Sequence, residues 1–332
     1  MKLSTYIGLV LLVPLLLSCQ KEVSPISASS RWQISTDPIV DGKLSDNGKF
    51  AALLLSNKRL ELWNNSAQRK VSLWQNEQLV ADSYLLALSE SAEYILSASH
   101  NTIQIWHTEA EESVGTLNLS AHLGDARITQ IRFWMSPYRV LIGTSSGDVI
   151  FADTQNNSYR VNRSHSGEVV KLELSNDQNF LFSGGNDGLV IKWDLINYRP
   201  LVTKKLPFRI TSLAVGLNDN LFVSDALKDH IIWNSEQDIV INEVTYFKRF
   251  QWFREALFDP QLRWLVTSSP KTDMYLWNLN DMSILGSWMV ESQSFGSTVE
   301  DLVLLEANTL RTLTSDGVIQ DWDLSTLSPD KL

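Results

Sequence analysis

The chain has 332 residues, of which 44% are hydrophobic, so it can bury a sizeable core. Its formal net charge of −10 argues against a nucleic-acid-binding surface, because such surfaces gather Lys and Arg against phosphates. The single cysteine, Cys19, lies near the N-terminus, so the remainder of the chain contains no disulfide and no thiol metal ligand. Length alone would suggest about two domains, but an internal repeat overrides this expectation.

Residues 1–18 are predicted to be a signal peptide. The apolar run from Tyr6 to Leu17 has the length of a signal-peptide core and is short for a membrane span. It ends in Leu16-Leu17-Ser18-Cys19, which resembles the lipobox of bacterial lipoproteins. In that family the cysteine is lipidated and becomes the mature N-terminus, so the resemblance implies a lipid on Cys19. An ordinary signal peptide, or an uncleaved anchor, with an incidental cysteine is the alternative.

The residue after Cys19 bears on localisation. In the sorting rule of enteric-type lipoproteins, an Asp at this place retains the protein in the inner membrane, and this chain has Gln20. The resemblance therefore implies an outer-membrane lipoprotein facing the periplasm, with the inner membrane or the cell surface as alternatives. Residues 19–30 are rich in Ser and lack aromatic side chains, which predicts a flexible tether.

A strand-like motif recurs seven times between residues 31 and 327, at steps of 40 to 46 residues. A period of this size, with several strands in each unit, is typical of a β-propeller. The sequence therefore predicts an all-β fold, a seven-bladed propeller of four-stranded antiparallel blades, as one domain over residues 31–327. The third motif has Ala152 at the place where the other six have Trp63, Trp106, Trp193, Trp233, Trp277 and Trp322.

The fourth unit, residues 164–195, has the clearest pattern and resembles the WD-repeat family. In that family a His, a Ser or Thr, an Asp and a Trp form a buried hydrogen-bond chain within each blade. The resemblance implies this structural role for His165, Ser183, Asp187 and Trp193. A catalytic Ser–His–Asp triad is the competing interpretation, but no Gly-x-Ser-x-Gly nucleophile elbow surrounds Ser183.

The other units keep only parts of this pattern. The last unit keeps Thr312, Asp316 and Trp322 in matching register, and the second keeps Ser97 and Trp106. Units one, five and six keep little besides their tryptophan. The period therefore carries more weight than any single motif.

The last unit has room for three strands only. The segment Arg31–Thr36 is strand-like and precedes the first unit, so we expect it to complete the last blade, with Trp32 and Ile34 beside Ile319–Asp323. Closing the ring with an N-terminal strand removes an exposed sheet edge that would otherwise invite aggregation.

In propellers, the loops from the outer strand of one blade to the inner strand of the next surround the central channel on one face. Alignment of the units places residues of mixed charge and one large aromatic residue there, a mixture that suits a protein or peptide partner. The candidate partner-binding residues are Asp82, Arg127, Glu168, Arg209, Arg249 and Trp252.

Three aromatic features leave alternatives open. The stretch Tyr246–Arg254 interleaves aromatic residues with Lys and Arg, which is compatible with blade core, with a protein contact or with stacking on nucleic-acid bases. Trp134 precedes a predicted turn, so we expect it at the surface, and Trp288 is a second apolar surface candidate.

No motif in the sequence predicts catalysis. The five His form no metal-ligand motif, no Gly-rich phosphate loop is present, and the acidic pair Glu300-Asp301 has no partner that sequence can identify. We therefore expect no catalytic residue, no metal and no cofactor. The expected function is a monomeric, non-catalytic scaffold for other envelope proteins or peptides.

Two alternative functions remain open. Asp281–Trp288 is faintly similar to the repeats of eight-bladed propeller lipoproteins that assist outer-membrane protein assembly, which would make the chain an assembly factor of that kind. The other alternative is a propeller enzyme or small-ligand binder with a site at the central channel, where Asp82 and Glu168 would be the available carboxylates.

Overall fold

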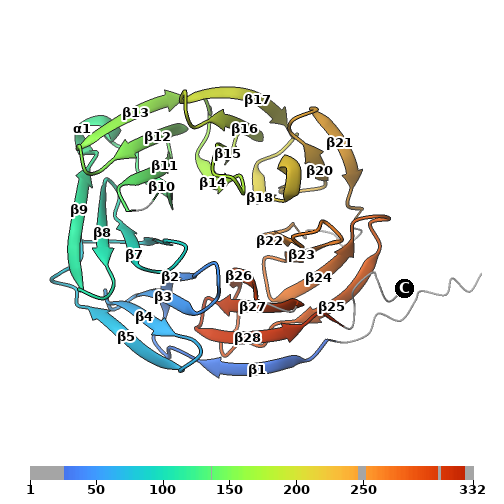
Figure 1. Cartoon of the computed structure of the whole chain (residues 1–332), viewed down its shortest axis with the longest axis horizontal. Helices are drawn as coiled ribbons and strands as arrows, with labels where there is room; N and C mark the ends of the chain where they lie inside the picture. The colour runs from blue at the N-terminus through green and yellow to red at the C-terminus, as the bar shows by residue number, and fades with distance from the viewer. Residues whose placement is uncertain (1–25, 136, 246–251, 306–307, 326–332) are drawn as a thin grey trace, which may run out of the picture.

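The structure is a computed structural model that describes residues 26–135, 137–245, 252–305 and 308–325. It confirms the predicted fold: seven four-stranded antiparallel sheets are arranged as blades around a central axis (Figure 1). The helical elements with defined bounds are a four-residue segment, α1 (Ser120–Leu123), and a short 3-10 turn, Leu217–Asp219. None of the helices in the described ranges has the length and apolar character needed to cross a membrane.

Each of the first six blades uses four consecutive strands, ordered from the inner strand to the outer strand. Blade one consists of β2 (Ile39–Leu44), β3 (Phe50–Leu55), β4 (Leu60–Asn64) and β5 (Arg69–Trp74). Blade two consists of β6 (Leu85–Leu88), β7 (Tyr94–Ala98), β8 (Thr102–His107) and β9 (Glu112–Asn118). Blade three consists of β10 (Ile128–Phe133), β11 (Arg139–Thr144), β12 (Asp148–Asp153) and β13 (Ser158–Arg163).

Blade four consists of β14 (Val169–Leu174), β15 (Phe180–Gly185), β16 (Leu189–Asp194) and β17 (Arg199–Lys205). Blade five consists of β18 (Ile210–Val215), β19 (Asn220–Asp225), β20 (His230–Asn234) and β21 (Ile239–Glu243). Blade six consists of β22 (Ala256–Phe258), β23 (Trp264–Ser268), β24 (Asp273–Asn278) and β25 (Ile284–Met289). Blade seven contains β26 (Val299–Leu305), β27 (Thr309–Thr314), β28 (Val318–Asp323) and the N-terminal strand β1 (Ala28–Gln33).

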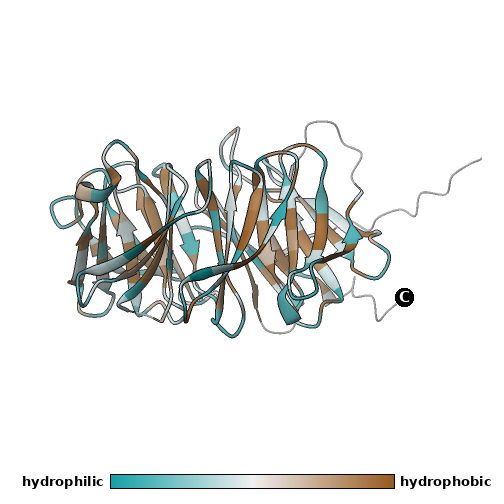
Figure 2. Ribbon diagram, turned by 90° about the horizontal axis from the view of Figure 1, so that it is seen from above, coloured by the Kyte–Doolittle hydropathy of each residue, from teal (hydrophilic) through white to brown (hydrophobic). Residues whose placement is uncertain are grey.

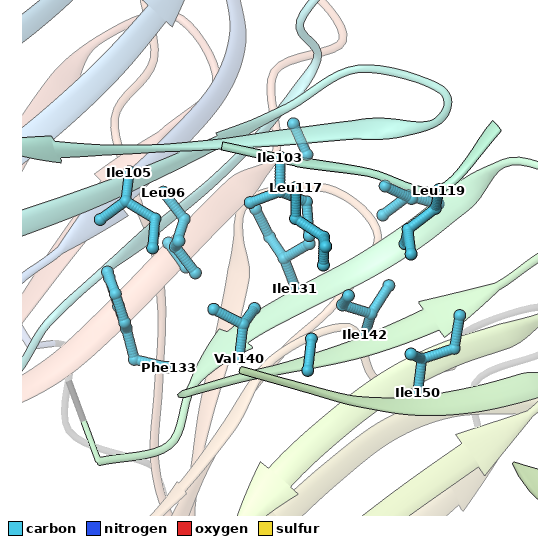
Figure 3. Packing of buried hydrophobic residues seen from close by; sticks show 14 of the residues in the cluster. Leu96, Ile103, Ile105, Leu117, Leu119, Ile131, Phe133, Val140, Ile142 and Ile150 are labelled. Atoms are coloured by element: carbon cyan, nitrogen blue, oxygen red, sulfur yellow. The ribbon is translucent and has the colours of Figure 1, made fainter. Parts of the chain in front are cut away.

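The core lies between the blades, because each sheet buries one face against its neighbour on either side. Figure 3 shows one such layer, in which Leu96 and Ile105 of blade two meet Ile131, Val140 and Ile142 of blade three. All five side chains are buried, and Ala152 belongs to the same cluster. Figure 2 shows the pattern over the whole ring: hydrophobic residues are frequent in the strands, and hydrophilic residues in the connecting loops.

The pairing of β1 with β28 closes the ring. Trp32 lies opposite Ile319 and Gln33 opposite Val318 in an antiparallel register. The strand begins at Ala28, so three residues of the predicted 19–30 tether belong to the sheet. Ile34 lies beyond the end of β1, where its N–H donates to the carbonyl of Gly317 at 2.9 Å.

The predicted exposure of Trp134 is wrong. Its side chain is buried at 6% exposure, and its indole N–H donates to the carbonyl of Gln178 in the next blade at 3.2 Å. The adjacent Met135, which adopts a positive φ, is the exposed residue of this turn. An indole that can both fill an inter-blade layer and satisfy its N–H gains more from burial than from exposure.

The Asp281–Trp288 segment does not introduce an eighth blade. Trp288 lies on β25, the outer strand of blade six, and its side chain is 7% exposed. Its ring packs against that of Trp322 in blade seven, with centroids 5.8 Å apart. The tryptophan therefore belongs to the inter-blade packing of a seven-bladed ring.

We predict that Trp32→Ala destabilises the ring more than Ser29→Ala does, although both residues lie on β1. The Trp32 ring packs beneath the Arg311 guanidinium at 4.9 Å, beside the cluster that closes blades seven and one, whereas Ser29 is exposed. For this partly buried tryptophan we expect a loss of about 2 kcal/mol in the free energy of unfolding, measured by urea denaturation. Equal stability of the two variants would contradict the role given to β1.

Candidate functional site

The best-formed polar cluster is the hydrogen-bond chain of blade four. The indole N–H of Trp193 donates to Ser183 Oγ at 2.8 Å, Ser183 Oγ lies 2.8 Å from His165 Nε2, and His165 Nδ1 lies 3.1 Å from Asp187 Oδ1. These contacts are all satisfied when Ser183 donates to Nε2 and the protonated Nδ1 of a neutral imidazole donates to the carboxylate. These hydrogen bonds hold β15, β16, the turn before Leu189 and the connection before β14 in one arrangement.

Two glycines make room for this cluster. A Cβ on Gly185 would lie 2.5 Å from both Asp187 Oδ1 and His165 Nδ1, so any side chain there would displace the pair. Gly188 has φ +79°, and a Cβ on it would meet the carbonyl oxygen of Leu206 at 2.5 Å. The Asn-Asp-Gly turn thus requires glycine for both conformation and space.

The hydrogen bonds around Asp187 control its pKa. Burial alone would raise the pKa of this carboxyl. The hydrogen bonds from His165 and from the backbone N–H groups of Leu189 and Ser166 outweigh burial and hold the pKa below its usual range. Because Ser183 is completely buried, the cluster offers no surface to a substrate. Its geometry is that of a structural lock.

Other blades keep one hydrogen bond of this four-residue arrangement, the one from the indole to a hydroxyl. The indoles of Trp106 and Trp322 donate to Ser97 Oγ and Thr312 Oγ1, both at 3.1 Å. Trp277 donates to Thr267 Oγ1 at 2.9 Å, a partner that the sequence interpretation missed. The hydroxyl lies ten residues before the indole in both Trp277 and Trp322, and this constant spacing is the signal that identifies Thr267.

Blade five departs from the pattern. Its serine, Ser224, lies 2.8 Å from Nδ1 of His230, which is on the third strand of the blade and not before the first. The indole of Trp233 donates instead to Asp238 at 3.0 Å. Burial lowers the pKa of His230, so the histidine is kept neutral within the core.

We call the face that contains the outer-to-inner blade connections, together with the turns between the second and third strands, the upper face. Of the residues predicted to bind a partner, those that the structure describes lie on it, but they do not converge. Arg127 pairs with Glu168 at 3.2 Å, and Asp82 pairs with Lys58 at 3.2 Å. The Arg209 guanidinium lies over the Trp252 ring at 6.0 Å. Arg249 falls outside the described residues.

A second polar cluster, which the sequence interpretation missed, lies along the inner strands around the ring centre (Figure 1). We call it the channel network. Its ion pairs connect Lys43 with Asp41 (3.4 Å), Arg132 with Glu173 (2.8 Å), Lys171 with Glu255 (2.9 Å) and Arg254 with Glu300 (2.9 Å). The Lys171–Glu255 pair joins blade four directly to blade six, across the inner strand of blade five that lies between them.

The channel network also binds neighbouring blades through their backbones. Asp301 accepts a hydrogen bond from the N–H of Leu44 at 2.8 Å, which joins blade seven to blade one. Asp41 does the same with the N–H of Leu86 at 2.7 Å, which joins blade one to blade two. The acidic pair Glu300-Asp301 therefore has partners, and it reaches them across blade boundaries.

Burial and charge compete in this network. Burial raises the pKa of Asp301 to about 6 in spite of the opposing field of Lys43. Burial would lower the pKa of Lys43, but the carboxylates of Asp41, Asp301, Glu255 and Glu300 raise it above its ordinary value. Lys43 is therefore the cation that compensates several carboxylates at once.

The described ranges show no constellation suited to metal binding, since no group of three or more His, Cys, Asp or Glu could hold an ion there. Asp82 and Glu168 are each engaged by a cation. A hollow of about 570 Å³ lies on the upper face between blades seven and one, lined by loop residues that include Asp37, Phe295 and Asp316. The carboxylate of Asp316 is engaged by the backbone N–H groups of Gln293 and Ser294.

Comparison with known proteins agrees with the geometry of blade four. Residues 156–194 match the family model described as WD domain, G-beta repeat. The matched segment runs from β13, the outer strand of blade three, through the first three strands of blade four. It includes the whole hydrogen-bond chain from His165 to Trp193.

Two curated proteins are similar to parts of the chain. Actin-interacting protein 1 of Drosophila melanogaster is 22% identical over 155 residues, which are 46% of this chain and 25% of that protein. The anaphase-promoting complex subunit cdc20 of Dictyostelium discoideum is 29% identical over 139 residues, 40% of this chain and 26% of that protein. The similarity thus spans about a quarter of the length of these relatives. Together with the fold, these matches support a WD-repeat propeller.

We predict that Asp187→Ala costs about 1–3 kcal/mol of unfolding free energy, because it leaves His165 and two backbone N–H groups without their acceptor. Asp229→Ala in the equivalent turn of blade five is the matched control and should cost less than about 0.5 kcal/mol. Urea denaturation of both variants gives the comparison. Equal losses would contradict the proposed lock.

The Asp187 effect should also depend on pH. The pKa of Asp187 is lower in the folded protein than in the unfolded chain, so its contribution is complete above about pH 4 and is lost as the pH falls through the folded pKa. The stability difference between wild type and Asp187→Ala should therefore shrink in acid.

We predict that Lys43→Met lowers the unfolding free energy at pH 7 by about 1–3 kcal/mol, between the values for surface and buried ion pairs, because Asp41 and Asp301 lose their shared cation. The pKa of Asp301 is raised, so its charged form opposes folding as the pH rises from about 4 through about 6. The loss should accordingly be smaller at pH 5. Lys58→Met removes an exposed partner and serves as the control. A loss that is the same at pH 5 and pH 7 would contradict the assignment.

Proposed function

We propose that this protein is a non-catalytic scaffold of the bacterial cell envelope, anchored by a lipid on Cys19 and holding partner proteins or peptides on its upper face. The proposal places the anchor in the outer membrane and the propeller, as a monomer, in the periplasm. The observation that carries the scaffold part is the form of the upper face: a closed seven-bladed ring presents loops of mixed charge and exposed aromatic residues on one side.

The direction of β1 supports display of this face. Ala28 lies opposite Trp322, at the lower end of blade seven, and Gln33 lies opposite Val318, near the upper turns. The chain therefore enters the propeller from the lower side. Ala28 follows Cys19 by nine positions, which corresponds to at most about 30 Å of extended chain. An anchor at Cys19 would hold the lower side toward the membrane and leave the upper face accessible.

We predict that Cys19→Ala abolishes incorporation of a palmitate analogue and moves the protein from the membrane fraction to the soluble fraction. Ser24→Ala, in the same segment, is the matched control and should behave as wild type. The measurement is metabolic labelling with an alkyne fatty acid, followed by fractionation of cells that express the tagged full-length chain. Equal labelling and equal membrane retention of the two variants would contradict the lipid anchor.

The scaffold part needs a separate measurement. Crosslinking on intact cells, followed by purification of the wild type and of Cys19→Ala, should identify envelope proteins that only the anchored form captures. Recovery of the protein alone from the wild type would contradict a scaffold function.

A further inference from the structure

One part of the upper face brings together exposed cations and exposed large apolar side chains. It lies beside the upper ends of the inner strands of blade five, and we call it the blade-five patch. It consists of Phe208 and Arg209 in the loop before β18, Leu227 and Lys228 in the turn between β19 and β20, and Trp252 in the loop before β22.

The cations of the patch lack carboxylate partners. Elsewhere on the upper face, Arg59, Lys58 and Arg127 each pair with an acidic side chain. Arg209 and Lys228 are exposed, and neither forms an ion pair with any residue in the described part of the chain. The guanidinium of Arg209 contacts the Trp252 ring instead. This contact orients the cation and leaves its N–H groups available to an anionic group.

Apolar side chains accompany these cations. Phe208 is 39% exposed and Leu227 is 54% exposed, although both are large enough to favour burial. An aromatic and an aliphatic side chain beside an exposed Arg form the kind of mixed surface that provides binding hot spots. The partner that complements this surface contains apolar side chains next to carboxylates.

The patch is also held in place. The N–H of Ala226 donates to the carbonyl of Arg209 at 3.0 Å, which joins the loop before β18 to the turn between β19 and β20. The buried Asp225 Oδ1 accepts from the backbone N–H groups of Leu227 and Lys228, at 2.9 and 2.8 Å. These bonds fix the turn before any partner arrives, so binding requires little additional ordering.

We propose that the blade-five patch binds an acidic segment of a partner protein in which carboxylates flank an apolar side chain. This proposal rests on the scaffold function proposed above and names the partner chemistry of its upper face. The carboxylates pair with Arg209 and Lys228, and the apolar side chain packs against Phe208 and Leu227. Charge complementarity selects this partner, because the patch exposes unpaired cations on a chain whose net charge is −10.

The test is a selection from a phage-displayed library of random 12-residue peptides on the immobilised full-length chain. Enriched peptides should contain Asp or Glu beside Leu, Phe or Trp. A synthetic copy of the most enriched peptide is then titrated by fluorescence anisotropy. We expect binding to weaken by about 10-fold or more in Arg209→Glu, which is about 1.4 kcal/mol, and to weaken as salt rises.

Arg69→Glu is the matched control, because it makes the same change in net charge at an exposed position on the outer strand of blade one. It should change the affinity less than about twofold, and repeated titrations of the wild type should agree within the same limit. Leu227→Ser tests the apolar half of the patch without altering charge. It should weaken binding while leaving the salt dependence unchanged.

Three outcomes would overturn the proposal. Enriched peptides without acidic residues would exclude the partner chemistry, and peptides that bind Arg209→Glu as tightly as wild type would place the site elsewhere while leaving the scaffold function intact. A single-stranded oligothymidine that displaces the peptide at comparable concentration would indicate a nucleic-acid site. Absence of any peptide enriched above a protein-free surface would contradict the patch and the scaffold function together.

Discussion

Closure of the ring is the constraint on which the other features depend. Each blade buries both of its faces, so a blade without a neighbour would expose an apolar layer such as the one between blades two and three. The pairing of β1 with β28 supplies the fourth strand of blade seven. It joins residues about 290 positions apart in the sequence, a separation typical of the non-local contacts that make all-β proteins fold slowly.

Within the closed ring, polar contacts hold the structure together in two places, inside the blades and around the central channel. Inside blades two, four, six and seven, an indole donates to a serine or threonine hydroxyl, and blade four has the complete chain of four residues. At the centre, carboxylates reach backbone N–H groups of the next blade, as Asp41 does with Leu86. The inner strands converge there, so charges from different blades share one small volume and Lys43 must compensate several carboxylates. These contacts between blades help to hold the ring closed.

The sequence predicted what depends on local pattern. The period of the tryptophans gave the number of blades, and the resemblance of residues 164–195 to the WD-repeat family implied the four residues, from His165 to Trp193, that the structure joins by hydrogen bonds. It could not predict the channel network, because Lys171 and Glu255 are 84 residues apart and meet only when blades four and six face the same centre. It also misplaced Trp134, because a turn in the sequence does not reveal whether a carbonyl in the next blade, here that of Gln178, will accept the indole N–H.

The same reasoning explains why the upper face could be predicted only as a set of positions. Alignment of the repeats placed Arg127 and Arg209 at equivalent sites, but their surroundings differ. Glu168 neutralises Arg127, whereas Trp252 orients Arg209 without neutralising it. Seven equivalent loops thus become unequal through their neighbours, and a ring with a repeated backbone acquires one sector that is suited to an acidic partner. The blade that carries this sector is also the one in which the serine–histidine contact has moved to Ser224 and His230. Its loops are fixed instead by Asp225, whose carboxylate holds the turn that exposes Leu227 and Lys228.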